Sequence, residues 1–161
     1  QSALTGHLVF STLHTNDAAS AVTRLIDMGV EPFLVASSVN AIIAQRLVRT
    51  ICPHCREAYT PSLNHLELAA LPADEYAGVE LFRGRGCEAC LHTGYRGRIG
   101  IFEVMTLTPE MKEFILTTSE AGKIKARALA LPDTGMRTLF ADGIRKVLAG
   151  LTTLEEVFRV T

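Results

Sequence analysis

The four cysteines of the chain stand in two pairs, and this spacing limits what the chain can fold into more than any other feature of its sequence. Cys52 and Cys55 form one C-x2-C pair, Cys87 and Cys90 form the second, and residues 56–86 separate the pairs. Tetrahedral zinc is commonly bound by four thiolates that two tight turns present in pairs. The long separation is tolerable because the entropic cost of closing a loop rises only logarithmically with its length. The spacing therefore predicts a structural Zn²⁺ centre without an open catalytic position.

Three other interpretations of the cysteines remain open at this stage: two disulfides, a redox pair, and unrelated buried thiols. Disulfides are rare in intracellular proteins, and a redox C-x-x-C motif is normally single and opens a helix after a strand. His54 lies inside the first pair and His92 follows the second. With four thiolates available, we expect both histidines to be solvated neighbours of the metal rather than ligands.

The bulk composition is that of a globular protein of one domain, or of one domain and a small satellite. The chain has 161 residues, of which 48% are hydrophobic and 20% charged, with a formal net charge of −1. This charge does not favour a nucleic-acid partner. No apolar run approaches the roughly 18 residues that span a bilayer, and the first residues do not resemble a signal peptide. The chain lacks a starting Met, and "QSALTG" is typical of a helix end, so we expect a C-terminal piece of a longer protein.

The stretch "GHLVFSTLHTND" (residues 6–17) places two histidines around an apolar run. Residues 7–13 predict a strand buried on both faces, as in a parallel sheet. His14 would then follow the carboxyl end of the strand, where α/β proteins bind ligands, and the start of the next helix would suit a phosphate. In the alternative interpretation His14 only fills the crevice and His7 is a core histidine.

The rest of the chain predicts mainly helices. Apolar spacing predicts one helix from Ala18 to about Gly29 and a second from Pro32 through Val48. Residues 98–105 alternate as a strand does. Further helices are expected over 63–71, from Thr108, over 119–130, over 138–150, and after a capping box at Thr152 and Glu155 or at Thr153 and Glu156.

The nucleotide-binding P-loop pattern G-x-x-x-x-G-K-[S/T] occurs nowhere in the sequence. No acidic residue follows an earlier strand where it could organise Mg²⁺. The chain is therefore not expected to complete a nucleotide site alone.

Four ordered blocks of the sequence resemble the secretion ATPases of the general secretory pathway protein E type, which drive type II secretion and type IV pilus assembly. The blocks are "LTGHLVFSTLHTNDA", "AQRLVRTICPHC", "CEACLHTGYRGRIGIFEVM" and "DGIRKVLAGLTTLEEVFRVT". The resemblance implies that His7 and His14 are histidine-box residues near the γ-phosphate. It also implies that the four cysteines are the family's zinc ligands. Retraction-type pilus ATPases usually lack these cysteines, so the resemblance points to secretion or pilus extension.

The resemblance implies an α/β fold made of a partial RecA-like parallel-sheet ATPase core, an inserted zinc module and a C-terminal helical subdomain. The expected parts are residues 1–51, 52–98 and 99–161. The intact parent would be a hexamer that binds ATP and Mg²⁺ and hydrolyses ATP, whereas this chain alone would be inactive. It would lie in the cytoplasm, peripheral to the bacterial inner membrane, through platform and cytoplasmic-domain proteins of the apparatus. The resemblance does not separate type II secretion from pilus assembly.

A zinc-ribbon module that binds a protein or nucleic acid, without enzymatic activity, is the alternative function. Arginines surround the second cysteine pair, and two aromatic residues that could stack on bases, Phe82 and Tyr95, are nearby. The arginines are Arg83, Arg85, Arg96 and Arg98. The net charge of −1 and the long helical tail argue against this alternative.

Overall fold

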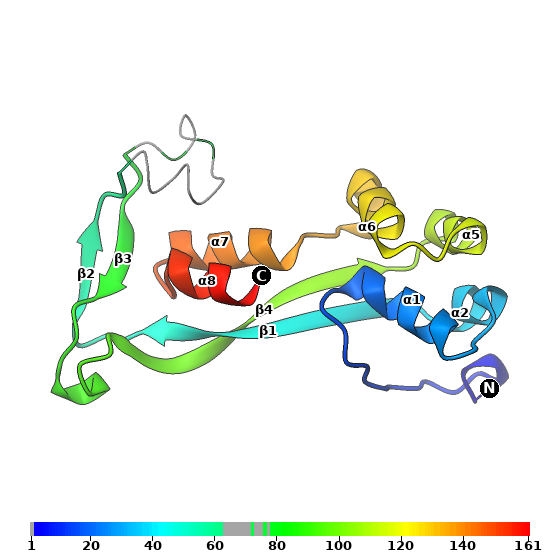
Figure 1. Ribbon diagram of the computed structural model, residues 1–161, viewed down its shortest axis with the longest axis horizontal. Helices are drawn as coiled ribbons and strands as arrows, with labels where there is room; N and C mark the ends of the chain where they lie inside the picture. The colour runs from blue at the N-terminus through cyan, green and yellow to red at the C-terminus, as the bar shows by residue number, and fades with distance from the viewer. Residues whose placement is uncertain (1, 63–71, 73–75, 77) are drawn as a thin grey trace. The chain divides into compact units, whose positions relative to one another are not determined.

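The computed structural model describes residues 2–62, 72, 76 and 78–161 (Figure 1). Its contacts divide the chain into two compact units, each built from two segments. Unit 1 contains residues 1–45 and 102–138, and unit 2 contains residues 46–101 and 139–161. The division falls inside two paired strands, β1 (Ala41–Ile51) and β4 (Tyr95–Thr106). The three-part organisation expected from the sequence stays a prediction.

Unit 1 opens with a 3-10 turn, Ser2–Thr5, and continues through a coil into helix α1 (Ala18–Asp27) and helix α2 (Pro32–Ser38). Asp17 caps α1, since its Oδ1 accepts a hydrogen bond of 2.9 Å from the amide of Ser20. Pro32 occupies the first turn of α2, where a missing amide hydrogen costs nothing. Both helix starts agree with the sequence prediction.

The strand predicted for residues 7–13 is wrong for this structure. These residues form an exposed coil that leads into α1 (Figure 1). Leu8 is 77% exposed and Phe10 is 88% exposed. A strand needs a neighbour that takes up its backbone hydrogen bonds, and the described sheets consist only of β1 with β4 and β2 with β3.

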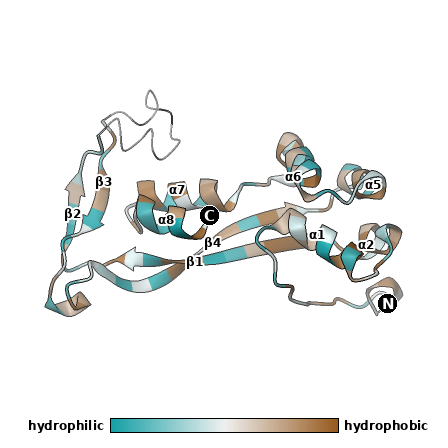
Figure 2. Ribbon diagram, viewed as in Figure 1, coloured by the Kyte–Doolittle hydropathy of each residue, from teal (hydrophilic) through white to brown (hydrophobic). Residues whose placement is uncertain are grey.

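The helix predicted to continue to Val48 is also wrong, because α2 ends at Ser38 and residues 41–51 form β1. Figure 2 shows the first residues of β1 as an apolar stretch. The buried side chains of Ala44 and Val48 are four positions apart, which suits one face of a strand as well as one face of a helix. The β-branched Ile42, Ile43 and Val48 favour the strand.

The strand and the two helices predicted between residues 98 and 130 are present. Residues 98–105 lie inside β4, and helices α5 (Pro109–Thr117) and α6 (Ala121–Ala130) come next. The hydroxyl of Thr108 caps α5 by accepting from the amide of Met111. Helix α1 packs against α6, and α2 packs against α5.

Unit 2 contains an antiparallel pair of short strands, β2 (Arg56–Tyr59) and β3 (Leu81–Gly84), and helices α7 (Leu139–Leu148) and α8 (Leu154–Val160). The strand pair aligns Arg56 with Gly84 and Tyr59 with Leu81. One hydrophobic core cluster of the unit consists of Leu81, Ile144, Val147, Leu154 and Val157. Thr153 caps α8 by accepting from the amide of Glu156, so the second of the two candidate capping positions is the one used. The helix expected over residues 63–71 lies outside the described residues.

The fold is α/β, as expected, but its described sheets are small. The arrows of β1 and β4 run in opposite directions in Figure 1, and β2 and β3 are also antiparallel. The parallel sheet expected from the sequence is therefore not among the described strands.

Glu156 ties α8 to β1 within unit 2. Its side chain is 2% exposed, accepts 2.8 Å from the amide of Arg49, and pairs with the guanidinium groups of Arg49 (2.7 Å) and Arg159 (2.9 Å). Burial opposes ionisation of Glu156, but the hydrogen bonds from Arg159 and Arg49 outweigh it and lower the pKa of the carboxyl to about 2.

Replacing Glu156 with Gln is expected to lower the stability of unit 2 in a pH-dependent way. A carboxyl whose pKa is depressed on folding stabilises the folded state above its unfolded pKa, near 4.5, and loses this effect as the pH falls toward 2. The difference between wild type and Glu156→Gln should be on the order of 2 kcal/mol at pH 7, since solvent screens the half-exposed arginines. Urea unfolding of both proteins at pH 7, 5 and 3 measures it. A difference that does not shrink below pH 4.5 would contradict this assignment.

Candidate metal centre

The first cysteine pair follows directly from β1. Cys52 comes after the last residue of the strand, and a turn through Cys55 leads into β2. The amide of Cys52 donates 2.9 Å to the carbonyl of Gly94, so the start of this turn is held against the chain that precedes β4. Cys52 and Cys55 are both buried.

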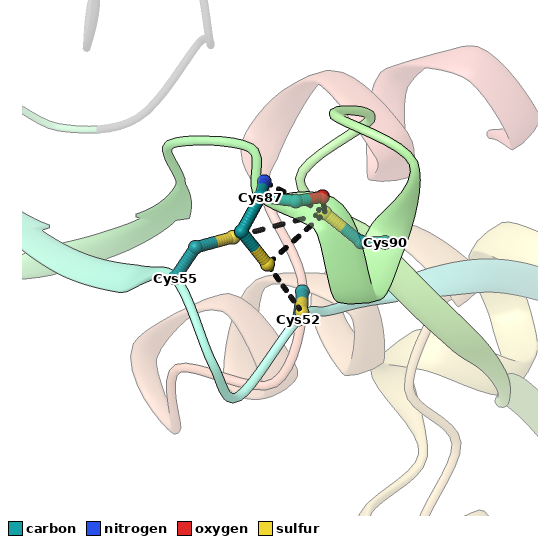
Figure 3. Close-up of side chains that lie close together, drawn as sticks. All are labelled: Cys52, Cys55, Cys87 and Cys90. Atoms are coloured by element: carbon teal, nitrogen blue, oxygen red, sulfur yellow. Dashed lines mark hydrogen bonds between the residues drawn. The ribbon is translucent and has the colours of Figure 1, made fainter.

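The second pair lies between β3 and β4, in a 3-10 turn at Glu88–Cys90. The turn ends in a left-handed residue, Leu91, with φ +52°. Both C-x2-C segments form a tight turn, in which the amide of the second cysteine donates to the carbonyl of the first. Figure 3 shows the side chains of the two pairs directed toward one another.

The four sulfurs lie at the spacing of a tetrahedral metal centre. The Sγ–Sγ distances are 3.9 Å between Cys52 and Cys87, 3.9 Å between Cys55 and Cys90, and 3.8 Å between Cys87 and Cys90. All four ligand atoms lie within 4.8 Å of one another. A tetrahedral ion with Zn–S bonds of about 2.3 Å holds its sulfurs about 3.8 Å apart. The four cysteines could therefore hold one metal ion.

These distances argue against the disulfide interpretation, because bonded sulfurs are only about 2.05 Å apart. The cysteines are free thiols in this structure. Backbone amides also donate to the sulfurs: Gly86 to Cys55 at 3.3 Å, Cys87 to Cys90 at 3.2 Å, and Gly94 to Cys90 at 3.3 Å. Such donors stabilise thiolates, which are the form that binds metal.

The two thiols with shifted pKa values differ in how well their surroundings stabilise the thiolate. Burial raises the pKa of the Cys55 thiol to about 12. Burial acts in the same direction on Cys90, but the amides of Cys87 and Gly94 outweigh it and lower the pKa of that thiol to about 6. Three of the four cysteines are buried and Cys87 is partly buried, so a nearby cation would favour ionisation of all four thiols, and a bound divalent ion supplies that charge.

Gly84 and Gly94 bring the two cysteine turns close together. A Cβ atom on Gly84 would overlap the carbonyl group of Gly94, and Gly94 itself has φ +77°. The amide of Gly94 donates to Cys90 and its carbonyl accepts from Cys52, so this residue links both pairs. Neither glycine was predicted from the sequence as part of the centre, although the position of both near the cysteine pairs is a usable signal.

Replacing Gly84 with Ala is expected to destabilise the centre by about 1–3 kcal/mol and to weaken metal binding, because the added methyl group must displace backbone. Competition with a chromophoric chelator and thermal unfolding measure the two effects. Gly122→Ala is the matched control, since a Cβ at that helical position meets nothing within 4 Å. Equal metal affinity in both variants would contradict the role assigned to Gly84.

His54 and His92 do not join the four sulfurs. Both side chains are exposed, and within the part of the chain that the structure describes the metal-binding group comprises the cysteines alone. This arrangement agrees with the expectation that the two histidines are solvated neighbours.

His7 and His14 belong to unit 1. Both are exposed on the coil before α1, and the Nδ1 of His7 is 3.0 Å from the hydroxyl of Thr5. A phosphate site at the start of α1 is not supported, because two of the first backbone amides of α1 already donate hydrogen bonds to carboxylates. Glu103 accepts from Ala18 at 2.9 Å, and Asp17 accepts from Ser20. Any contact of His14 with a phosphate would therefore be made by its own ring.

No helix of the described residues combines the length and the apolar character that crossing a membrane requires.

Comparisons with known proteins agree with the resemblance found in the sequence. The family model described as "Type II/IV secretion system protein" matches residues 1–159. The type II secretion system protein E of Pseudomonas aeruginosa is 48% identical over 161 residues, which are 100% of this chain and 31% of that protein. The type IV pilus assembly ATPase PilB of Thermus thermophilus is 45% identical over 161 residues, 100% of this chain and 18% of that protein.

A third relative, the type II secretion system ATPase E of Vibrio cholerae, is 46% identical over 167 aligned positions, which cover 100% of this chain and 31% of that protein. The chain thus spans less than a third of the length of each of these curated relatives.

Proposed function

The chain belongs to the family of type II/IV secretion system proteins, and we propose that it is the C-terminal part of an ATPase motor that drives type II secretion or type IV pilus extension. The observation that carries this proposal is the similarity of the whole chain to relatives named as ATPases of both systems. Identities of 45% and 46% to these two relatives do not separate the two systems.

In this proposal ATP hydrolysis needs residues beyond this chain. The sequence contains no P-loop, and phosphoryl transfer requires a site that cradles the phosphates and Mg²⁺. The intact parent supplies that site in a RecA-like core, and residues 8–10, whose apolar side chains are exposed here, pack against it. His7 and His14 then lie near the γ-phosphate. The chain by itself binds no nucleotide productively and has no ATPase activity.

We propose that the metal is zinc and that its role is structural. Four thiolates fill a tetrahedral coordination shell, which leaves no position for substrate or water. The sulfur spacing and the amide donors at Cys55 and Cys90 support this assignment. The ion would join the end of β1 to the start of β4, because one cysteine pair follows the first strand and the other pair precedes the second.

The intact parent is proposed to be a hexamer that binds ATP and Mg²⁺. It would act in the cytoplasm, at the inner membrane, through the platform and cytoplasmic-domain proteins of a secretion or pilus apparatus. The names of the relatives refer to a secretion system and to pilus assembly, and these names support partners of this kind.

The alternative of a nucleic-acid-binding zinc ribbon has less support from the site. The guanidinium of Arg56 lies 3.8 Å from the ring centre of Phe82, and that of Arg49 lies 4.2 Å from the ring centre of Tyr95. Both rings that could stack on bases are therefore covered by arginines of the same chain. A gel shift that weakens steeply with salt would favour the alternative.

The sequence encoded before residue 1 tests the proposed function directly. We expect a P-loop, and an acidic segment that ends a strand, within roughly 250 residues upstream, since the site must be completed there. An upstream reading frame without a P-loop would contradict the proposal.

A further inference from the structure

A buried carboxylate on β4 is tied to the start of α1. Glu103 is fully buried, and its Oε1 accepts 2.9 Å from the amide of Ala18, the first residue of the helix. Burying a charged carboxylate is costly unless hydrogen bonds and an opposite charge compensate it. The Nζ of Lys125, on α6, lies 3.3 Å from Oε2 of Glu103 and supplies that charge.

Lys125 also reaches the other carboxylate at the same helix end. Its Nζ is 3.0 Å from Oδ2 of Asp17, while Oδ1 of Asp17 accepts from Ser20. One ammonium group thus holds two carboxylates, and each carboxylate holds one of the first amides of α1. We call Asp17, Glu103 and Lys125 the anchoring triad. A second contact joins the same helices, because the hydroxyl of Thr23 donates 2.6 Å to the carbonyl of Ser119 just before α6.

One member of the anchoring triad, Asp17, directly follows in sequence the stretch that carries His14. Asp17 is three residues after His14, so the two Cα atoms are separated by no more than about 11 Å of chain. The hydroxyl of Thr15 donates 3.2 Å to the carbonyl of Asp17, which restricts this stretch further. Residues 7–12 before it form an exposed coil, whereas the segment after His14 leads directly into the start of α1 that the triad holds.

The geometry points to a positioning role: Glu103 and Lys125 fix the start of α1 so that the His14 ring is presented in one orientation to the phosphate of the proposed ATPase site. This inference rests on the proposed function. Glu103 and Lys125 do not touch the nucleotide in this proposal. Both act through Asp17 and the residues that precede Asp17. A misplacement of about 1 Å by a remote substitution can cost up to a hundredfold in rate.

The first test is made on this chain alone and does not need ATPase activity. Backbone ¹⁵N relaxation reports the mobility of residues 14–17 in wild type, Lys125→Met and Lys123→Met. Lys123 is the matched control, because it lies on the same helix, 64% exposed, in an ion pair with Glu120. We expect higher mobility of residues 14–17 in Lys125→Met only. Unchanged mobility in Lys125→Met would overturn the positioning role.

The second test measures ATP hydrolysis by the intact parent. Lys125→Met is expected to lower kcat roughly tenfold to a hundredfold while KM for MgATP changes less than about threefold. Lys125→Arg, which keeps the charge, should restore most of the rate, and Lys123→Met should match wild type. Glu103→Gln, which keeps an acceptor for Ala18 but not the charge, gives a second variant if Lys125→Met does not fold.

A double variant separates positioning from general stability. If Lys125 acts through His14, His14→Ala with Lys125→Met is no slower than His14→Ala alone. Rate losses that multiply would overturn the positioning role, as would a lower melting temperature with an unchanged kcat. If His14→Ala itself leaves kcat unchanged, the proposed function fails instead, and the relaxation result still stands on its own.

Discussion

Replacing Cys52 and Cys90 with serine is expected to release one equivalent of zinc and to unfold the segment between residues 52 and 98. The double variant removes one thiolate from each pair, so neither C-x2-C turn can hold the ion alone. Structural zinc contributes about 10 kcal/mol or more to folding, and we expect the melting temperature of unit 2 to fall by more than about 10 °C. Elemental analysis of the purified chain and thermal unfolding followed by circular dichroism measure both effects.

His54→Ala and His92→Ala are the controls for the cysteine variants, because both histidines are close to the cysteine pairs in sequence, are exposed, and do not belong to the cysteine group. They should keep one zinc per chain and melt close to wild type. If the double cysteine variant kept its zinc and its melting temperature, the assignment of a four-cysteine centre would be contradicted.

Replacing His14 with Ala in the intact parent is expected to lower kcat for ATP roughly a hundredfold while ATP affinity changes little. A histidine that interacts with the γ-phosphate mainly in the transition state contributes to the rate rather than to ground-state binding. Steady-state phosphate release gives kcat, and equilibrium binding of a fluorescent nucleotide gives the affinity.

His54→Ala in the same protein is the matched histidine control and should keep the wild-type rate. An affinity that falls as much as the rate in His14→Ala would show a binding role and not the phosphate-sensing role proposed here.

The clustering of the four cysteines was the feature of the structure that the sequence predicted best. Two C-x2-C pairs have few ways to fold with their sulfurs buried, and the structure brings all four within 4.8 Å. Helix starts were predictable for a similar reason. The caps at Asp17, Thr108 and Thr153 are local, since each side chain accepts from an amide three residues ahead.

The strand errors arose where burial is decided by distant residues. Residues 7–13 have the composition of a buried strand, but a strand forms only beside a partner, and the pattern does not contain that information. In residues 41–48 a helix was predicted, and the structure has a strand. The apolar positions fit both a helix and a strand, and pairing with β4 decided between them.

Glu103 could not be identified from the sequence for a related reason. It lies between Ile101 and Met105, which are buried on the same side of β4, while Phe102 and Val104 on the other side are apolar but exposed. With apolar residues on both sides, a single glutamate does not reveal which side is buried. Its partner Lys125 and the amide of Ala18 come from other parts of the chain.

Phosphate release from ATP shows whether this chain contributes only the histidine segment of an ATPase or also the site that holds the phosphates. The measurement compares the 161-residue chain with the intact parent at saturating MgATP. We expect Mg²⁺-dependent hydrolysis by the intact parent and no release above the buffer blank by this chain with zinc bound. Metal-dependent turnover by this chain alone would contradict this expectation.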